Sequence, residues 1–140
     1  MTGFRPYQKG GGQMPVMEPQ IVEQAHRQAM SASVPDVASY LQDLLSRRLV
    51  AYLAGVKDAK TVSRWANGEV KEVRQDSEER LRTAYQIAQL LVQFDSPRII
   101  KAWFIGLNPQ LGDDSPATTI REGRLKDALA AARAFVAGGG

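Results

Sequence analysis

Apolar residues recur every three or four positions along most of this chain, which is the spacing that gathers side chains on one face of an α-helix. Between residues 37 and 53 the recurrence is continuous, with apolar side chains at Val37, Leu41, Leu44, Leu45, Leu49, Tyr52 and Leu53. Ser33, followed by Pro35 and Asp36, has the order expected at a helix start. One long helix or two short ones would satisfy this pattern equally.

The same spacing predicts a longer helix over residues 75–94. Its apolar stripe consists of Leu81, Ala84, Tyr85, Ala88, Leu91 and Val92. Asp76 and Glu79 stand three residues apart, which is the spacing of a capping box, so we expect a capping box at the start of this helix.

Serine followed by proline predicts two more helix starts, because serine caps a helix and proline suits its first position. Ser96-Pro97 opens a segment with Ile99, Ile100, Trp103 and Phe104 that should end at Gly106. Ser115-Pro116 opens a short helix that should stop near Gly123, and a last helix is expected over residues 125–136.

No segment shows the strict alternation of a half-buried strand, so the fold class predicted is all-α, with six or seven helices in one compact body. Residues 1–20 combine Gly, Pro and Gln without a period, and residues 21–30 form a short helix or none. We therefore expect a flexible N-terminal arm over residues 1–32 and a flexible tail over 138–140.

The composition narrows the class of protein. The 140 residues are 44% hydrophobic, include no cysteine, and contain neither a membrane-length apolar run nor a signal-peptide pattern, so a cytoplasmic protein without a membrane anchor is expected. The net charge of +3 permits binding to a polyanion. Since His26 is the only histidine and the glycine clusters match no phosphate-binding loop, we expect no enzyme, metal site or cofactor.

The stretch "AGVKDAKTVSRWANG" has a specific functional shape. Gly55 can end one helix in the left-handed conformation, and Asp58 can cap the next. Within residues 59–67, one face holds Ala59, Val62, Trp65 and Ala66. The sequence therefore predicts a helix, a turn and a second helix with an apolar back.

The opposite face of residues 59–67 suits DNA recognition, because arginine pairs with guanine, asparagine with adenine, and lysine or threonine with phosphate. Ala51 and Gly55, four residues apart before the turn, favour a helix-turn-helix, although the turn "GVKD" is one residue longer than the tightest examples. The DNA-binding candidates are Lys57, Lys60, Thr61, Ser63, Arg64 and Asn67. The alternative is a core helix with a solvated outer face.

A second spaced set of residues follows the aromatic segment "KAWFIGL". It consists of Trp103, Asn108, Pro109, Leu111, Pro116, Ile120 and Gly123. Each of these residues also has a structural interpretation, as core or as turn chemistry. Function would then belong to the surface that they shape.

The joint order of the helix-turn-helix pattern and this second set resembles the Xre–MbcA–ParS antitoxins, which partner RES-domain toxins, over residues 35–137. The resemblance implies a DNA-binding, autoregulating region at 33–76 and a toxin-binding region at 77–137 that occludes the NAD-consuming site of the toxin. It makes the second set the toxin-binding motif. The chain departs from the pattern at Ala117, Thr118 and Thr119, where many relatives carry an acidic residue.

Two functions from different classes follow from these observations. The first is an antitoxin that binds a RES-type toxin and its own operator DNA, as a homodimer or a toxin–antitoxin hetero-oligomer. The second is a stand-alone helix-turn-helix regulator whose C-terminal half only dimerises. A RES-domain gene beside this one would separate the two.

Overall fold

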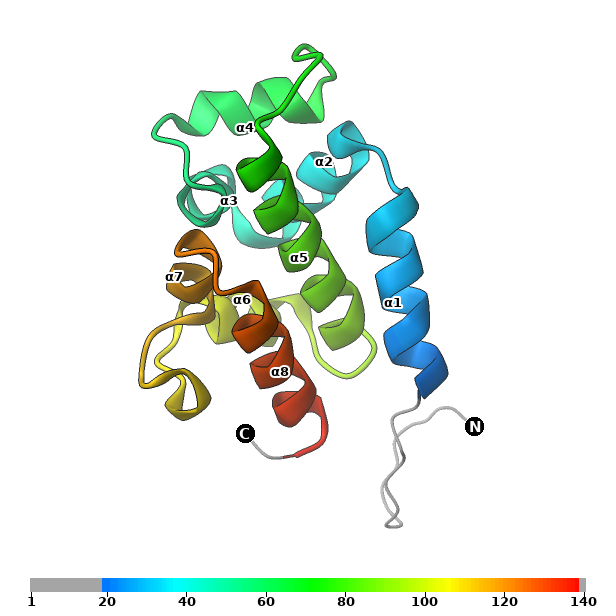
Figure 1. Ribbon diagram of the computed structural model, residues 1–140, viewed down its shortest axis with the longest axis vertical. Coiled ribbons are helices and arrows are strands. Elements are labelled where there is room, and N and C mark those ends of the chain that lie inside the picture. The colour runs from blue at the N-terminus through cyan, green and yellow to red at the C-terminus, as the bar shows by residue number, and fades with distance from the viewer. Residues whose placement is uncertain (1–18, 139–140) are drawn as a thin grey trace.

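The computed structural model describes residues 19–138, and all regular structure in that part of the chain is helical (Figure 1). The elements are α1 (Pro19–Ser31), α2 (Val34–Leu45), α3 (Arg47–Ala54), α4 (Ala59–Ala66), α5 (Gln75–Leu91), α6 (Pro97–Ile105), the 3₁₀ turn η1 (Pro109–Leu111), α7 (Pro116–Arg121) and α8 (Leu125–Val136). The all-α prediction is confirmed, with eight α-helices in the described residues where six or seven were expected. Over residues 19–138 there is no helix with the length and apolar character of a membrane span.

Helix α5 forms the centre of the molecule, because it packs against α1, α2, α3, α7 and α8. Its side chains Leu81, Ile87 and Leu91 are fully buried, and they belong to one continuous core that reaches from α2 to α8. Figure 1 shows α4 lying across one end of the molecule, beyond α2 and α3, with α6 and α8 towards the other end.

Four predicted helix starts are confirmed by hydrogen bonds. The side-chain oxygens of Ser33, Asp58, Ser96 and Ser115 each accept a bond from a backbone N–H two or three residues ahead. These caps are local, so the sequence alone specifies them.

The predicted capping box of α5 is wrong. The helix begins at Gln75, which places Asp76 inside the first turn, and the N-cap Arg74 supplies no side-chain bond. Asp76 instead accepts from the N–H of Ser77 and pairs with Arg74 and Arg80. The hydroxyl of Ser77 donates to the carbonyl oxygen of Ala54 at 2.9 Å, so a contact with the end of α3 fixes the start of α5.

Two short helices, and not one long one, cover residues 34–54. The break falls at Ser46, whose φ of 103° and ψ of 151° lie in a region that favours glycine. Its hydroxyl oxygen accepts a bond from the N–H of Leu49 and so caps α3. The chain changes direction there, which lets both helices contact α4.

The prediction of a flexible arm over residues 1–32 is wrong for residues 19–31, which form α1. Ala25 and Ala29 are buried in the packing of α1 on α5. Arg82 Nη1 donates to the carbonyl oxygens of Ala29 and Ala32, both at 2.7 Å, and so satisfies acceptors at the end of α1. Residues 1–18 of the predicted arm, and residues 139–140 of the predicted tail, lie outside the described residues.

Candidate functional site

Helix α4 is held by its apolar side. Gly55 adopts the left-handed conformation at the end of α3, with φ of 83°, and the chain turns until Asp58 caps α4 through the N–H of Lys60 at 2.9 Å. Val62 and Trp65 are buried, and α4 contacts both α2 and α3. The predicted apolar back of this helix is therefore confirmed.

The other side of α4 faces away from the core. Lys60, Arg64 and Asn67 are exposed, whereas Thr61 and Ser63 are half-buried. The Asn67 amide Nδ2 donates to the carboxylate of Glu69 at 3.3 Å. Of the DNA-binding candidates on the helix, Lys60 and Arg64 thus present charged groups to solvent, with Asn67 beside them.

Ser63 has an intramolecular partner that sequence spacing did not indicate. Arg47 Nη1 donates to its hydroxyl oxygen at 2.9 Å, which links the first turn of α3 to α4. The bond reduces the capacity of Ser63 to meet a ligand and holds the Arg47 guanidinium beside the outer face of α4. The sequence could have indicated Arg47 as a candidate, because Arg47 and Arg48 form an adjacent basic pair before the predicted turn.

The charge of residues 47–64 is strongly positive. This stretch holds five cations and one carboxylate, which is the cap Asp58. No ion pair between described residues involves any of the five, which are Arg47, Arg48, Lys57, Lys60 and Arg64. Unneutralised cations that are concentrated in one part of a protein attract a polyanion and raise its rate of association.

The second candidate region is the loop between α6 and α7, which is organised by Asn108. The carboxamide oxygen of Asn108 accepts from the N–H of Gln110 at 2.9 Å, and its carbonyl oxygen accepts from Leu111 and Asp113, also at 2.9 Å. Its own N–H donates to the carbonyl oxygen of Asp114 at 3.2 Å. Asn108 is buried and forms all of these hydrogen bonds, so it fixes the conformation of the loop.

Most residues of the second motif are buried as well. Trp103, Leu111, Pro116 and Ile120 lie in the interior, whereas Pro109 and Gly123 are exposed. The ring of Trp103 packs edge-on against Phe104 at a centroid distance of 5.3 Å. The motif therefore supports the fold of this region. A partner protein would contact the exposed residues that lie between the motif residues in the sequence.

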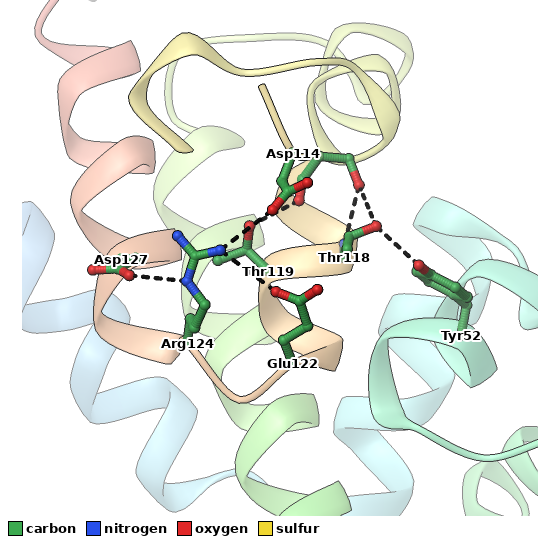
Figure 2. A network of polar contacts seen from close by, with 8 residues as sticks. Tyr52, Asp114, Thr118, Thr119, Glu122, Arg124 and Asp127 are labelled. Atoms are coloured by element: carbon green, nitrogen blue, oxygen red, sulfur yellow. Dashed lines mark hydrogen bonds and ion pairs between the residues drawn. The ribbon is translucent and has the colours of Figure 1, made fainter. Parts of the chain in front are cut away.

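Helix α7 is tied to its surroundings by polar contacts (Figure 2). The hydroxyl groups of Thr118 and Tyr52 lie 2.9 Å apart, which joins α7 to α3. On the other side of α7, the Arg124 guanidinium bonds to three carboxylates at 3.2 to 3.4 Å, namely those of Asp114, Glu122 and Asp127. Thr118 thus has a structural role, because its hydroxyl links α7 to α3.

Exposed apolar side chains precede this ordered loop. Leu107, directly before Asn108, is 80% exposed, and Ile105 at the end of α6 is 55% exposed. Periodicity did not select these residues, because they fall outside the predicted motif and outside the helical stripe. Exposed apolar surface beside a preordered loop is typical of a protein-binding site.

Comparisons of the chain with protein-family models, curated proteins and solved structures found no match.

Proposed function

We propose that this protein is an antitoxin that binds operator DNA through α3 and α4 and holds a RES-type toxin through the surface formed by α6, η1 and α7. DNA binding is the part that the geometry supports best. It is supported by one observation above all: α4 buries Val62 and Trp65 and carries the exposed cations Lys60 and Arg64 on its outer side.

A recognition helix needs one side packed against the rest of the domain and the opposite side exposed, because its exposed side chains must enter the major groove without unfolding the domain. Helix α4 meets both requirements, and Lys57 and Arg47 add charge beside it. In the proposed complex, Arg64 reads a base edge, Asn67 leaves Glu69 for a base or a phosphate, and the lysines contact phosphates.

The toxin-binding part rests on the resemblance and on the surface before α7. The buried motif residues hold the loop over residues 108–115 in one conformation, so little conformational entropy is lost when a partner binds. Leu107 and Ile105 offer apolar area that a partner can bury next to that loop. The toxin contacts are therefore assigned to Leu107, Ile105 and the exposed Gln110.

The DNA-binding part is tested by Arg64→Ala, with Arg98→Ala as the matched control. Both arginines are exposed and neither forms an ion pair with a described residue, but Arg98 lies on α6. If Arg64 pairs with a guanine, the loss should cost about 1–3 kcal/mol, or about 5- to 150-fold in Kd. The measurement is fluorescence anisotropy on duplex DNA from upstream of the gene. Equal Kd values for the two variants would contradict the assignment of α4.

The toxin-binding part is tested by Leu107→Asp, with Met30→Asp as the control. Met30 is also exposed and apolar, at 63%, but it lies on α1. On co-expression with the RES-domain toxin of the same operon, Leu107→Asp should fail to restore growth, and Met30→Asp should restore it fully. Truncation after Ala131 is a less specific change, because it removes Phe135, which packs on Trp103.

The stand-alone regulator makes a different prediction for Leu107. If the C-terminal half only dimerises, Leu107→Asp should convert a dimer into a monomer in sedimentation while no toxin is bound by either form. A wild-type chain that neither binds nor neutralises the toxin would favour that function over the antitoxin.

A further inference from the structure

An open groove crosses the boundary between the two predicted regions. It lies along α3 and the turn after it, and Arg121 is the one lining residue that α7 contributes. The lining also includes Ser46, Arg48, Tyr52 and Lys57. Three of the lining residues are cations, and none is a carboxylate. The DNA-binding candidates selected from the sequence included only one of the three, Lys57.

The three cations have no acidic partner in the part of the chain that the structure describes. No ion pair there involves Arg48, Lys57 or Arg121. The nearest acidic residue along the chain to Lys57, Asp58, is engaged as the cap of α4. Three uncompensated cations around one groove repel one another, and an anion placed between them relieves that repulsion.

Arg121 is held in place before any ligand arrives. Its guanidinium stacks on the ring of Tyr52, with 4.7 Å between the guanidinium carbon and the ring centroid, and Nη1 donates to the carbonyl oxygen of Tyr52. The hydroxyl of Tyr52 is in turn fixed by Thr118 at 2.9 Å. A guanidinium has five N–H donors, so an ordered Arg121 keeps donors for a phosphate.

The groove also adjoins α4. Lys57 belongs to the turn before this helix, and Ala59, its first residue, lines the groove. Figure 1 shows this turn at the side of the molecule where α3 and α7 approach each other, while α4 extends across the end. In helix-turn-helix complexes the helix before the recognition helix crosses the phosphate backbone, and the corresponding helix here is α3, which lines the groove.

We propose that the groove binds the phosphodiester backbone of the same duplex DNA, with Arg48, Lys57 and Arg121 each contacting a phosphate. The inference rests on the proposed DNA binding and extends it, because Arg121 brings the C-terminal region into the DNA interface. A partner held near α7 would then share that helix with the DNA.

Phosphate binding is measurable without knowledge of the operator, because it is independent of sequence. The probe is a mixed-sequence duplex of about 30 base pairs, and the readout is the slope of log K against log salt concentration. This slope changes by about 0.9 for each phosphate that the protein no longer neutralises. The groove variant is Arg48→Gln with Lys57→Gln and Arg121→Gln. The control variant, Lys101→Gln with Lys126→Gln and Arg133→Gln, removes the same charge from α6 and α8.

The groove variant should show a slope shallower than the wild type by about 2–3, and the control variant a slope close to that of the wild type. Equal slopes for the two variants would overturn the inference. The double variant Arg48→Gln with Lys57→Gln guards against a folding effect, because neither residue forms a side-chain hydrogen bond or ion pair with another described residue; its slope should change by about 2.

The outcome is separable from that of the proposed function. If Arg64→Ala weakens duplex binding and the groove variant matches its control, only the groove assignment fails. If the wild type binds no duplex at low salt, both fail. A groove variant that loses affinity for single-stranded RNA of equal length, but not for the duplex, would overturn DNA as the occupant.

Discussion

Replacing Trp65 by alanine removes the largest side chain that anchors α4 to the body of the protein. The indole is 4% exposed and belongs to the continuous core. Truncating a buried tryptophan costs about 3–5 kcal/mol, since both apolar burial and packing are removed. In a protein of this size that destabilisation should lower Tm by about 10–15 °C.

The neighbouring residue provides the internal comparison. Arg64 is exposed and has no side-chain partner among the described residues, so Arg64→Ala should change the free energy of unfolding by less than about 0.5 kcal/mol. Thermal unfolding followed by circular dichroism measures both effects, and DNA affinity is measured below the lower Tm. The two variants should therefore separate, with Trp65→Ala losing stability and Arg64→Ala losing affinity.

A Trp65→Ala variant that melts within about 3 °C of the wild type would refute the role of Trp65 as an anchor, because that shift corresponds to only about 1 kcal/mol. The assignment of α4 to DNA recognition would be refuted if Arg64→Ala destabilised the fold as much as Trp65→Ala and left the affinity for DNA unchanged. In either case α4 would not have the two distinct sides that DNA recognition requires.

Three further changes test other parts of the structure. Ser46→Gly should raise the free energy of unfolding by about 1 kcal/mol or more. A residue in this conformation stores about 1–3 kcal/mol of strain, and glycine replaces a serine cap at little cost. A Tm lower than that of the wild type would contradict the strain. Arg82→Met should speed amide hydrogen exchange in α1, since the bonds to Ala29 and Ala32 are removed; unchanged exchange would contradict the role of Arg82. Burial raises the pKa of Asp95 above its ordinary value, so the stability linked to this carboxyl is complete below the ordinary pKa and is lost as the pH rises through the raised pKa. Asp95→Asn should therefore raise Tm at about pH 7 and not at about pH 3, and an equal gain at both would contradict the shift.

The features predicted correctly are those that neighbouring residues specify. Ser33, Asp58 and Ser115 cap the helices that follow them, because a cap needs only a side chain and an amide two or three residues away. The apolar back of α4 follows from residue spacing in the same way. The fold class and most helix positions could be predicted from the sequence for this reason.

The features missed depend on contacts between distant parts of the chain. Helix α1 has a polar composition, and it is fixed by Arg82, about fifty residues away along the chain. The start of α5 is set by the bond from Ser77 to Ala54. The break at Ser46 places serine in a conformation that local preference disfavours.

In the candidate site, too, the residues specified by local sequence were predicted and the contacts between distant segments were missed. Lys60 and Arg64 were selected by helical spacing, and they lie on the exposed side as expected. The bond from Arg47 to Ser63 and the approach of Arg121 to the groove require the folded arrangement of α3, α4 and α7. No pattern in the sequence places residues 57 and 121 in the lining of one groove.

The central claim is that α4 and the turn before it meet DNA. The most direct measurement is amide hydrogen exchange by mass spectrometry on the full chain, with and without duplex DNA from upstream of the gene. Slower exchange in the peptides that cover residues 55–68, with α6 and α8 unchanged, is the predicted result. Protection confined to α6–α8, or no protection at a DNA concentration that saturates binding, would contradict the account.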